Sequence, residues 1–172
     1  MDKAASKVKK ISQARLQNIA LWYLERFGGT RARVRHALLR RVQAAEAVHG
    51  PTPEAAGWIE EVLNTLERLG HINDAAFATS RVAKGQRQGK SRALIRQDLT
   101  RAGVAPNTID QALDTALEDS ANAELDAART YVQRRHLGPY RSEPELHYDK
   151  DLARLARRGF SYEIARRALA ED

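Results

Sequence analysis

A short sequence pattern recurs three times along this chain and constrains its fold more than any other feature. In each copy an amphipathic helix ends in basic residues or a basic residue and a glycine, and an apolar residue leads into a second, capped helix. The two clearest copies are Leu99–Val104, followed by Ile109 and Leu113, and Leu155–Phe160, followed by Ile164 and Leu169. Gly103 and Gly159 occupy the same position in these copies and are 56 residues apart. Recurrence at this distance predicts tandem supersecondary units that pack on their neighbours and act through an extended surface, not a closed pocket.

Hydrophobic periodicity predicts helix almost throughout the chain. Apolar residues follow the i, i+3, i+4 spacing over residues 16–27, 59–66 and 109–117, and no alternating β-branched run competes with it. Glycine, proline and capping residues mark the ends of these segments. The predicted helices span residues 13–28, 30–46, 53–69, 74–88, 91–102, 107–118, 121–135, 145–158 and 161–170. The predicted fold is therefore all-α, an elongated array of three tandem three-helix repeats.

The grouping of these helices predicts four parts of the chain. They are a basic N-terminal tail over residues 1–12 and three repeats over residues 13–70, 71–120 and 121–172. The third helix of the first repeat lies about ten residues later than the middle repeat predicts, so we expect an insertion in a loop over residues 47–52. Gly70, Gly103 and Gly159 are predicted to lie just past helix ends, where a positive φ favours glycine.

Composition indicates a folded protein and excludes several classes. Hydrophobic residues make up 42% of the chain and charged residues 30%, which is enough apolar material for a core. The absence of cysteine excludes disulfides, thiolate catalysis and sulfur-ligated metals, and it favours a reducing cytoplasm. No apolar run approaches the ~20 residues that a membrane span needs, and the N-terminus lacks the apolar stretch of a secretion signal. We therefore expect a cytoplasmic protein without membrane contact.

The sequence predicts a protein that is not an enzyme. Its five histidines lack metal-ligating spacing, and it has no glycine-rich nucleotide-binding motif and no nucleophile elbow. We therefore expect no catalytic residue, no cofactor and no metal. Asp149 and Asp151 are interpreted as surface charges at a helix start, and Asp74 as the cap of the helix that begins there. Phe77 and Phe160 are expected in the core.

Positive charge is concentrated in two parts of the chain. The net charge is +7, yet residues 1–50 alone carry +8 and residues 81–101 carry +6. This clustering favours a polyanion or an acidic protein face as partner, although a solvated helical surface would carry the same charges. Charge reversal of Arg92 and Arg96, which share a helix face, is expected to weaken partner binding and leave stability nearly unchanged. The candidate partner-binding residues are Arg81, Lys84, Arg87, Lys90, Arg92, Arg96, Arg101, Arg31 and Arg35.

The middle of the chain resembles a known family. The segment Gly70-His71-Ile72-Asn73-Asp74-Ala75-Ala76-Phe77-Ala78, followed by Gly89, Arg92, Ile95, Leu99, Arg101, Gly103 and Val104, closely resembles the RecX family of bacterial recombination regulators. The C-terminal Arg158-Gly159-Phe160, followed by Ile164, is similar to the last repeat of that family. The first repeat matches more loosely, through Leu24, Arg26, Thr30, Val34 and Leu38, and it has Val42 at the position of the repeat glycine.

The resemblance implies a fold and a function. The fold is a helical crescent of three-helix units. The function is binding to the RecA recombinase filament on single-stranded DNA, mainly to inhibit strand exchange, ATP hydrolysis and co-protease activity in recombination, DNA repair and the SOS response. The partner is thus a RecA-like recombinase, with an auxiliary contact to DNA left open, and the regulator is expected to be a cytoplasmic monomer.

An alternative function is direct DNA binding by a helix-turn-helix module. In this interpretation residues 91–102 form the inserted helix, and Arg92 and Arg96 reach bases or phosphates. The absence of stacking aromatics from residues 81–101 disfavours a single-stranded DNA reader there. Trp22 and Trp58 are interpreted as lying on apolar helix faces.

Overall fold

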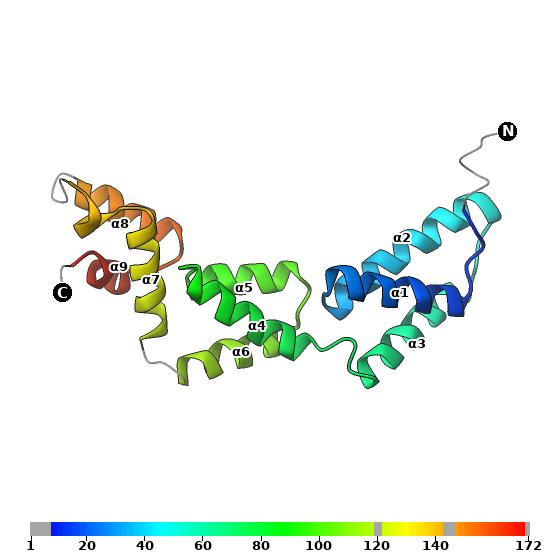
Figure 1. The fold of residues 1–172 in the computed structure, drawn as a ribbon. Helices are drawn as coiled ribbons and strands as arrows, with labels where there is room; N and C mark the ends of the chain where they lie inside the picture. Colours follow the sequence, from blue (N-terminus) through cyan, green and yellow to red (C-terminus); the bar gives the residue numbers. More distant parts are fainter. Residues whose placement is uncertain (1–7, 119–121, 143–146, 171–172) are drawn as a thin grey trace. The chain divides into compact units, whose positions relative to one another are not determined.

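The structure is a computed structural model that describes residues 8–118, 122–142 and 147–170. These residues form helices joined by turns, with no strand among them (Figure 1). The elements are α1 (Gln13–Phe27), α2 (Arg31–His49), α3 (Ala55–Arg68), α4 (Asp74–Arg87), α5 (Arg92–Arg101), α6 (Pro106–Glu118), α7 (Ala123–Arg134), the 3-10 helix η2 (Gly138–Tyr140), α8 (Tyr148–Arg157) and α9 (Tyr162–Leu169). The predicted all-α fold of helical repeats is confirmed.

The predicted helix boundaries agree with the structure to within three residues wherever the structure describes them. The predicted starts at residues 121 and 145, and residues 1–7 of the predicted tail, lie outside the described residues. The largest difference is at the end of α2, which continues through Val42 to His49 and ends at Gly50, whose φ is 87°. The extra residues of the first repeat therefore lengthen α2 itself, and the expected loop insertion is wrong in this respect.

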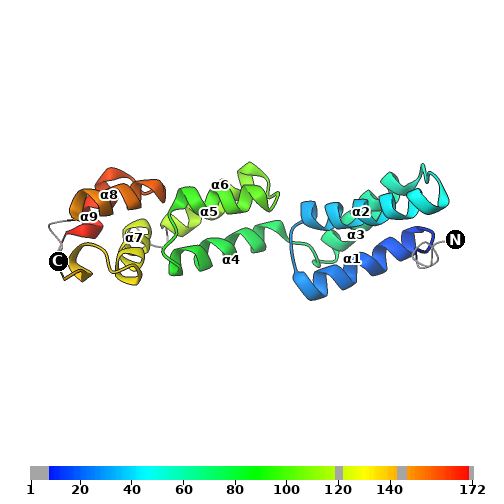
Figure 2. The ribbon, with the colours of Figure 1, turned by 90° about the horizontal axis from the view of Figure 1, so that it is seen from above.

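The chain divides into two compact units, Met1–Asp74 with Ala102–Val104, and Ala75–Arg101 with Ala105–Asp172. In the first unit α1, α2 and α3 pack against one another (Figure 2). Their apolar stripes enclose a core whose largest fully buried side chains include Leu16, Leu38, Ile59, Leu63 and Leu66. Three of these side chains come from α3, whose strong amphipathic pattern therefore supplies much of this core.

In the second unit α7 and α8 both pack on α9, and α5 packs on α6. Val132, Leu137, Leu155 and Phe160 are buried together between α7, α8 and α9, which confirms the core position predicted for Phe160. Phe77 of α4 is only half-buried. The guanidinium of Arg81 lies 5.1 Å from the centroid of its ring, so Phe77 is at an edge of the unit and not in its core.

Two hydroxyl groups form the same buried junction at different places in the chain. Thr30, the residue before α2, donates from Oγ1 to the carbonyl of Ala102 at 2.5 Å, and Ser91, before α5, donates from Oγ to the carbonyl of Arg158 at 2.5 Å. Both residues are fully buried. Each hydroxyl also accepts from a backbone N–H of its own helix, Arg33 N at 3.3 Å and Leu94 N at 3.2 Å. Each hydroxyl thus both donates and accepts a hydrogen bond within the protein, without water.

Glycine is required next to each of these carbonyls. Gly103 and Gly159 have φ values of 77° and 82°, as the sequence predicts. A Cβ on Gly103 would overlap the Cβ of Ala32, and one on Gly159 would lie 2.8 Å from the Cβ of Ala93. The recurring glycine therefore serves two purposes, because it ends a helix in the left-handed conformation and also lets another helix approach closely.

The third group of helices has a buried ion pair. Asp151 of α8 is fully buried and accepts hydrogen bonds from Nε and Nη2 of Arg141, both at 2.8 Å, and from the backbone N–H of Gly138 at 2.9 Å. The interpretation of Asp151 as a surface charge is therefore wrong. Burial acts to raise the pKa of Asp151, but the hydrogen bonds from Arg141 and Gly138 and the charges of Arg141 and Arg154 outweigh it and hold the pKa below its ordinary value of 3.8.

We expect Gly103→Ala and Gly159→Ala each to lower the free energy of unfolding by about 2–3 kcal/mol, because a Cβ meets both an unfavourable φ and a neighbouring helix. The matched control is Gly57→Ala on the exposed side of α3, where a Cβ has no neighbour within 4 Å. Its expected effect is a gain of about 0.5–1 kcal/mol from higher helix propensity. Urea unfolding measures the free energy of unfolding of all three variants, and a Gly103→Ala or Gly159→Ala protein as stable as the parent would contradict the close approach.

The buried ion pair predicts a pH dependence. Because the pKa of Asp151 is lower in the folded state, its contribution to stability is complete well above pH 3.8 and is lost as the pH falls through the folded value. Asp151→Asn should cost about 3 kcal/mol at pH 7, since it leaves Arg141 without its carboxylate. Thermal unfolding of both proteins from pH 7 to pH 2 should show the difference shrinking on acidification, and a constant difference would contradict the assignment.

Candidate functional site

The nine candidate cations fall on three helices and one connection. Arg31 and Arg35 lie on α2, Lys90 precedes α5, and the rest divide between α4, with Arg81, Lys84 and Arg87, and α5, with Arg92, Arg96 and Arg101. Their surroundings differ, and the differences decide which of them are available to a partner.

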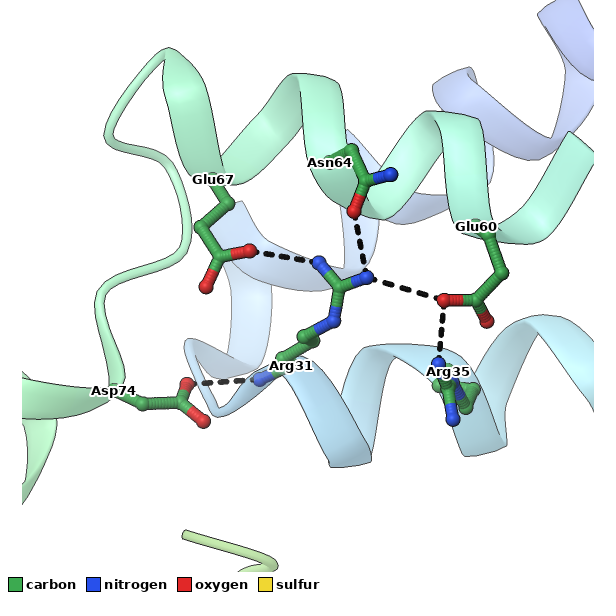
Figure 3. A network of polar contacts seen from close by, with 6 residues as sticks. All are labelled: Arg31, Arg35, Glu60, Asn64, Glu67 and Asp74. Carbon is green, nitrogen blue, oxygen red and sulfur yellow. Dashed lines mark hydrogen bonds and ion pairs between the residues drawn. The ribbon is translucent and has the colours of Figure 1, made fainter. Parts of the chain in front are cut away.

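Arg31 and Arg35 are directed at α3 (Figure 3). Arg31 donates from Nη1 to Glu67 at 2.7 Å, and from Nη2 to Glu60 at 3.1 Å and to Asn64 at 2.7 Å. Arg35 donates from Nη2 to the same oxygen of Glu60 at 2.5 Å. Two guanidiniums therefore face two carboxylates of α3, and these ion pairs tie α2 to α3.

Asp74 completes the network from the start of α4 (Figure 3). Its Oδ1 accepts from the backbone N–H of Arg31 at 2.9 Å, so the carboxylate satisfies the first turn of α2, whereas the sequence predicts that it caps the helix it begins. Burial raises the pKa of Asp74, and the charge of Glu67 adds to this, against the lowering by the hydrogen bond and the charge of Arg31. The charged form of Asp74 is thus disfavoured by its surroundings.

The start of α5 repeats the arrangement at the start of α2. Arg92 donates from Nη2 to Asp114 at 2.6 Å and from Nη1 to the carbonyl of Leu113 at 3.1 Å, and Arg96 pairs with Asp110 at 2.6 Å. All three partners lie on α6. The backbone N–H of Arg92 faces Glu124 at 3.4 Å, as that of Arg31 faces Asp74. Because these arginines hold α5 on α6, the premise that Arg92 and Arg96 are free surface charges does not hold.

Hydrophobic periodicity does not detect this arrangement, but the sequence carries another signal for it. The stretches Thr30-Arg31-Ala32-Arg33-Val34-Arg35 and Ser91-Arg92-Ala93-Leu94-Ile95-Arg96 share a hydroxyl, an arginine, an alanine, a β-branched residue and a second arginine in the same order, 61 residues apart. In both, the hydroxyl and the alanine form the junction, and the two arginines face the third helix of their group. The shared hexapeptide is thus a structural signature.

The cations that remain available lie mainly on α4. Lys90 pairs with Asp98 at 2.6 Å. Lys84, Arg87 and Arg101 form no ion pair within residues 8–118, 122–142 and 147–170, and all three are exposed. Arg81, Lys84 and Arg87 follow one another at intervals of three along α4, so they form a basic stripe on one side of this helix. We call these three residues the α4 stripe.

Neither a metal site nor a membrane span is found in the part of the chain that the structure describes. No three histidine, aspartate or glutamate side chains there are grouped as ligands of one ion. None of the described helices combines the length and the apolar character that crossing a bilayer requires.

The network around Asp74 predicts that Asp74→Asn is at least as stable as the parent at pH 7, because the amide oxygen still accepts from Arg31 and no charge is buried. Asp74→Ala loses this acceptor and should cost about 1 kcal/mol. Since the folded pKa is raised, the parent is most stable relative to Asp74→Asn below pH 3.8 and loses that advantage as the pH rises through the folded value. Chemical denaturation of the three proteins at pH 4 and pH 7 tests this order, and an asparagine variant as weak as the alanine variant would rule it out.

Comparison with known proteins agrees with the sequence resemblance. A family model described as the second three-helix domain of RecX matches residues 73–113. The regulatory protein RecX of Agrobacterium fabrum is 33% identical over 157 residues, covering 90% of this chain and 81% of that protein. The crystal structure of RecX from Lactobacillus salivarius shares the fold, with a TM-score of 0.68 at 24% identity over 91% of this chain and 94% of that one. A second crystal structure, of a regulatory protein RecX, has a TM-score of 0.64 at 23% identity, over 94% of this chain and 71% of the other.

The regulatory protein RecX of Myxococcus xanthus is similar over almost its whole length. It is 34% identical over 172 residues, which cover 98% of this chain and 91% of that protein. Identity at this level over both chains exceeds what a shared fold alone explains. This chain belongs to the RecX family of regulatory proteins.

Proposed function

We propose that this chain is a cytoplasmic, monomeric regulator that binds a RecA recombinase filament on single-stranded DNA and restrains its strand exchange, ATP hydrolysis and co-protease activity. Membership of the RecX family supports a regulatory role. The observation that supports a direct contact with the recombinase is the α4 stripe. Its cations are exposed, whereas Arg31, Arg35, Arg92 and Arg96 of α2 and α5 are paired with carboxylates within the fold. The stripe also lies inside the segment that matches the RecX family model.

The α4 stripe fits an acidic protein face better than a small ligand. Lys84 and Arg87 are exposed and Arg81 lies over Phe77, so the stripe combines mobile charges with one half-buried ring. Exposed charges of this kind speed association with an oppositely charged surface and make it dependent on salt. Asp74 is the only acid on α4, and it is engaged with Arg31 at the start of that helix. The stripe therefore presents positive charge without internal compensation along most of its length.

The helix-turn-helix alternative receives no support from the geometry. A recognition helix needs side chains that reach base edges, and Arg92 and Arg96 were its candidates. Both are paired with carboxylates of α6, and Arg92 also binds the carbonyl of Leu113. Contacts of these arginines with DNA would require that these pairs break, which disfavours this function for α5.

The proposal predicts that the protein suppresses RecA-dependent ATP hydrolysis on single-stranded DNA in a dose-dependent manner. Lys84→Glu with Arg87→Glu should raise the concentration needed for half-suppression about tenfold, because two attractive charges become repulsive. The unfolding free energy should stay within about 0.5 kcal/mol of the parent, since both side chains are exposed.

The matched control reverses Arg134 and Arg135, an adjacent exposed pair at the end of α7. It should suppress hydrolysis as the parent does. A parent protein without effect on hydrolysis would refute the proposed function, and a Lys84→Glu, Arg87→Glu protein as potent as the parent would remove the α4 stripe from it.

A further inference from the structure

A groove lies between α1 and α2 of the first unit. Two hollows there, with volumes of about 580 and 430 Å³, share Ile19, Trp22 and Arg41 in their walls and so form one continuous depression. No residue of the α4 stripe lines it. The groove is a separate feature from the contact proposed above.

Aromatic side chains of α1 are exposed at this groove. Trp22 is 51% exposed and Phe27 60%, although the sequence pattern places Trp22 on an apolar face of its helix. Their ring centroids are 5.9 Å apart in an edge-to-face arrangement, and Tyr23 lies 5.3 Å from Phe27. The rings therefore contact one another, while Trp22 and Phe27 each remain more than half exposed to solvent. Exposed aromatic rings, which residues 81–101 lack, are therefore present on α1.

Guanidinium groups surround the rings. Arg15 and Arg41 line the larger hollow, and Arg40 and Arg41 line the smaller one. Arg26 lies 5.9 Å from the centroid of Trp22 and 5.8 Å from that of Phe27. The Nε of Arg15 is buried and has no hydrogen-bond partner among the described residues.

Negative charge is absent from the walls of the groove. None of the described residues that line either hollow is acidic, and Arg40 and Arg41 form no ion pair within the described part of the chain. Glu25, three residues after Trp22 on α1, is the nearest acid along that helix and is not among the lining residues. The arginines of this groove thus differ from Arg31, Arg35, Arg92 and Arg96, whose charges are met by carboxylates of the same fold.

The geometry points to a binding site for single-stranded nucleic acid in the α1–α2 groove, with bases stacked on Trp22 and Phe27 and phosphates on Arg15, Arg40 and Arg41. Unpaired strands present both an anionic backbone and free base faces, and these are the two chemistries that the groove combines. A duplex offers the phosphates but keeps its bases stacked inside. An acidic peptide offers the charge but no regular series of flat rings, so the exposed aromatic pair favours the nucleic acid.

The first test measures stacking on Trp22 directly. Trp58→Phe, at a partly buried site beside the core, leaves Trp22 as the only tryptophan. Addition of an oligodeoxythymidine of about 15 nucleotides should quench its fluorescence to saturation. The dependence of log affinity on log salt should have a slope of about −2.1, as expected for three phosphate contacts with a single strand. Absence of quenching at low salt overturns the proposal.

The second test separates the contribution of the rings to binding from that of the charges. It measures binding through the fluorescence anisotropy of a labelled oligonucleotide. Trp22→Ala should weaken binding at least about fivefold with an unchanged salt slope, because stacking is lost and the phosphate contacts remain. Arg40→Glu with Arg41→Glu should weaken binding and reduce the slope to about −0.7. The Arg134→Glu, Arg135→Glu protein, with the same change of charge in the second unit, should bind as the parent does.

Competition distinguishes the nucleic acid from other occupants. A polyglutamate peptide and a blunt duplex of matched charge should displace the labelled strand only weakly. Displacement by polyglutamate as effective as by unlabelled oligodeoxythymidine would assign the groove to an acidic protein segment and overturn the proposal. The Lys84→Glu, Arg87→Glu protein should keep the quenching of Trp22, so a failure of recombinase regulation and a failure of the groove can be told apart.

Discussion

The hydroxyl groups of Thr30 and Ser91 each donate one hydrogen bond and accept another while fully shielded from water. A buried hydroxyl that lost a partner would cost about 1–3 kcal/mol, so the carbonyls of Ala102 and Arg158 have to lie within reach. The approach is close enough that the residue after each carbonyl has no room for a side chain. A hydroxyl residue, an alanine and a glycine far away in the sequence therefore form one packing motif, and the chain contains this motif twice.

This packing motif determines which arginines are paired within the fold. Because the hydroxyl fixes the first turn of α2 or α5, the arginine that follows it and the arginine four residues later both face the third helix of the group. Carboxylates on that helix neutralise them. A count of basic residues along the sequence includes these arginines, whereas Lys84 and Arg87 of the α4 stripe and Arg40 and Arg41 of the α1–α2 groove form no ion pair within the described residues. Net charge favours a polyanionic partner, and the pairing within the fold distinguishes the cations that are already engaged from those that are not.

Helix positions could be predicted well because each helix carries its own signal. Amphipathic spacing and capping residues are local, and they placed every described boundary within three residues. The end of α2 is less well marked in the sequence, because Val42 stands where the other repeats have their glycine and the alanine-rich residues that follow continue the helix as far as Gly50. Local patterns could not reveal that Asp74 serves α2 or that Asp151 is buried, since their partners come from other elements. The exposure of Trp22 could not be predicted for a related reason, because periodicity identifies an apolar face but does not show whether another helix covers it.

The third helical group differs from the other two in what holds its second helix. His147 precedes α8 and its side chain makes no capping hydrogen bond. The carboxylate of Asp151 ties α8 to η2 instead, through Gly138 and Arg141. A hydroxyl does not change its charge over the pH range in which proteins fold, whereas a carboxylate is neutralised on acidification. Acid therefore weakens the packing of α8 while the bonds of Thr30 and Ser91 persist, so the group formed by α7, α8 and α9 is where acid unfolding of this chain should begin.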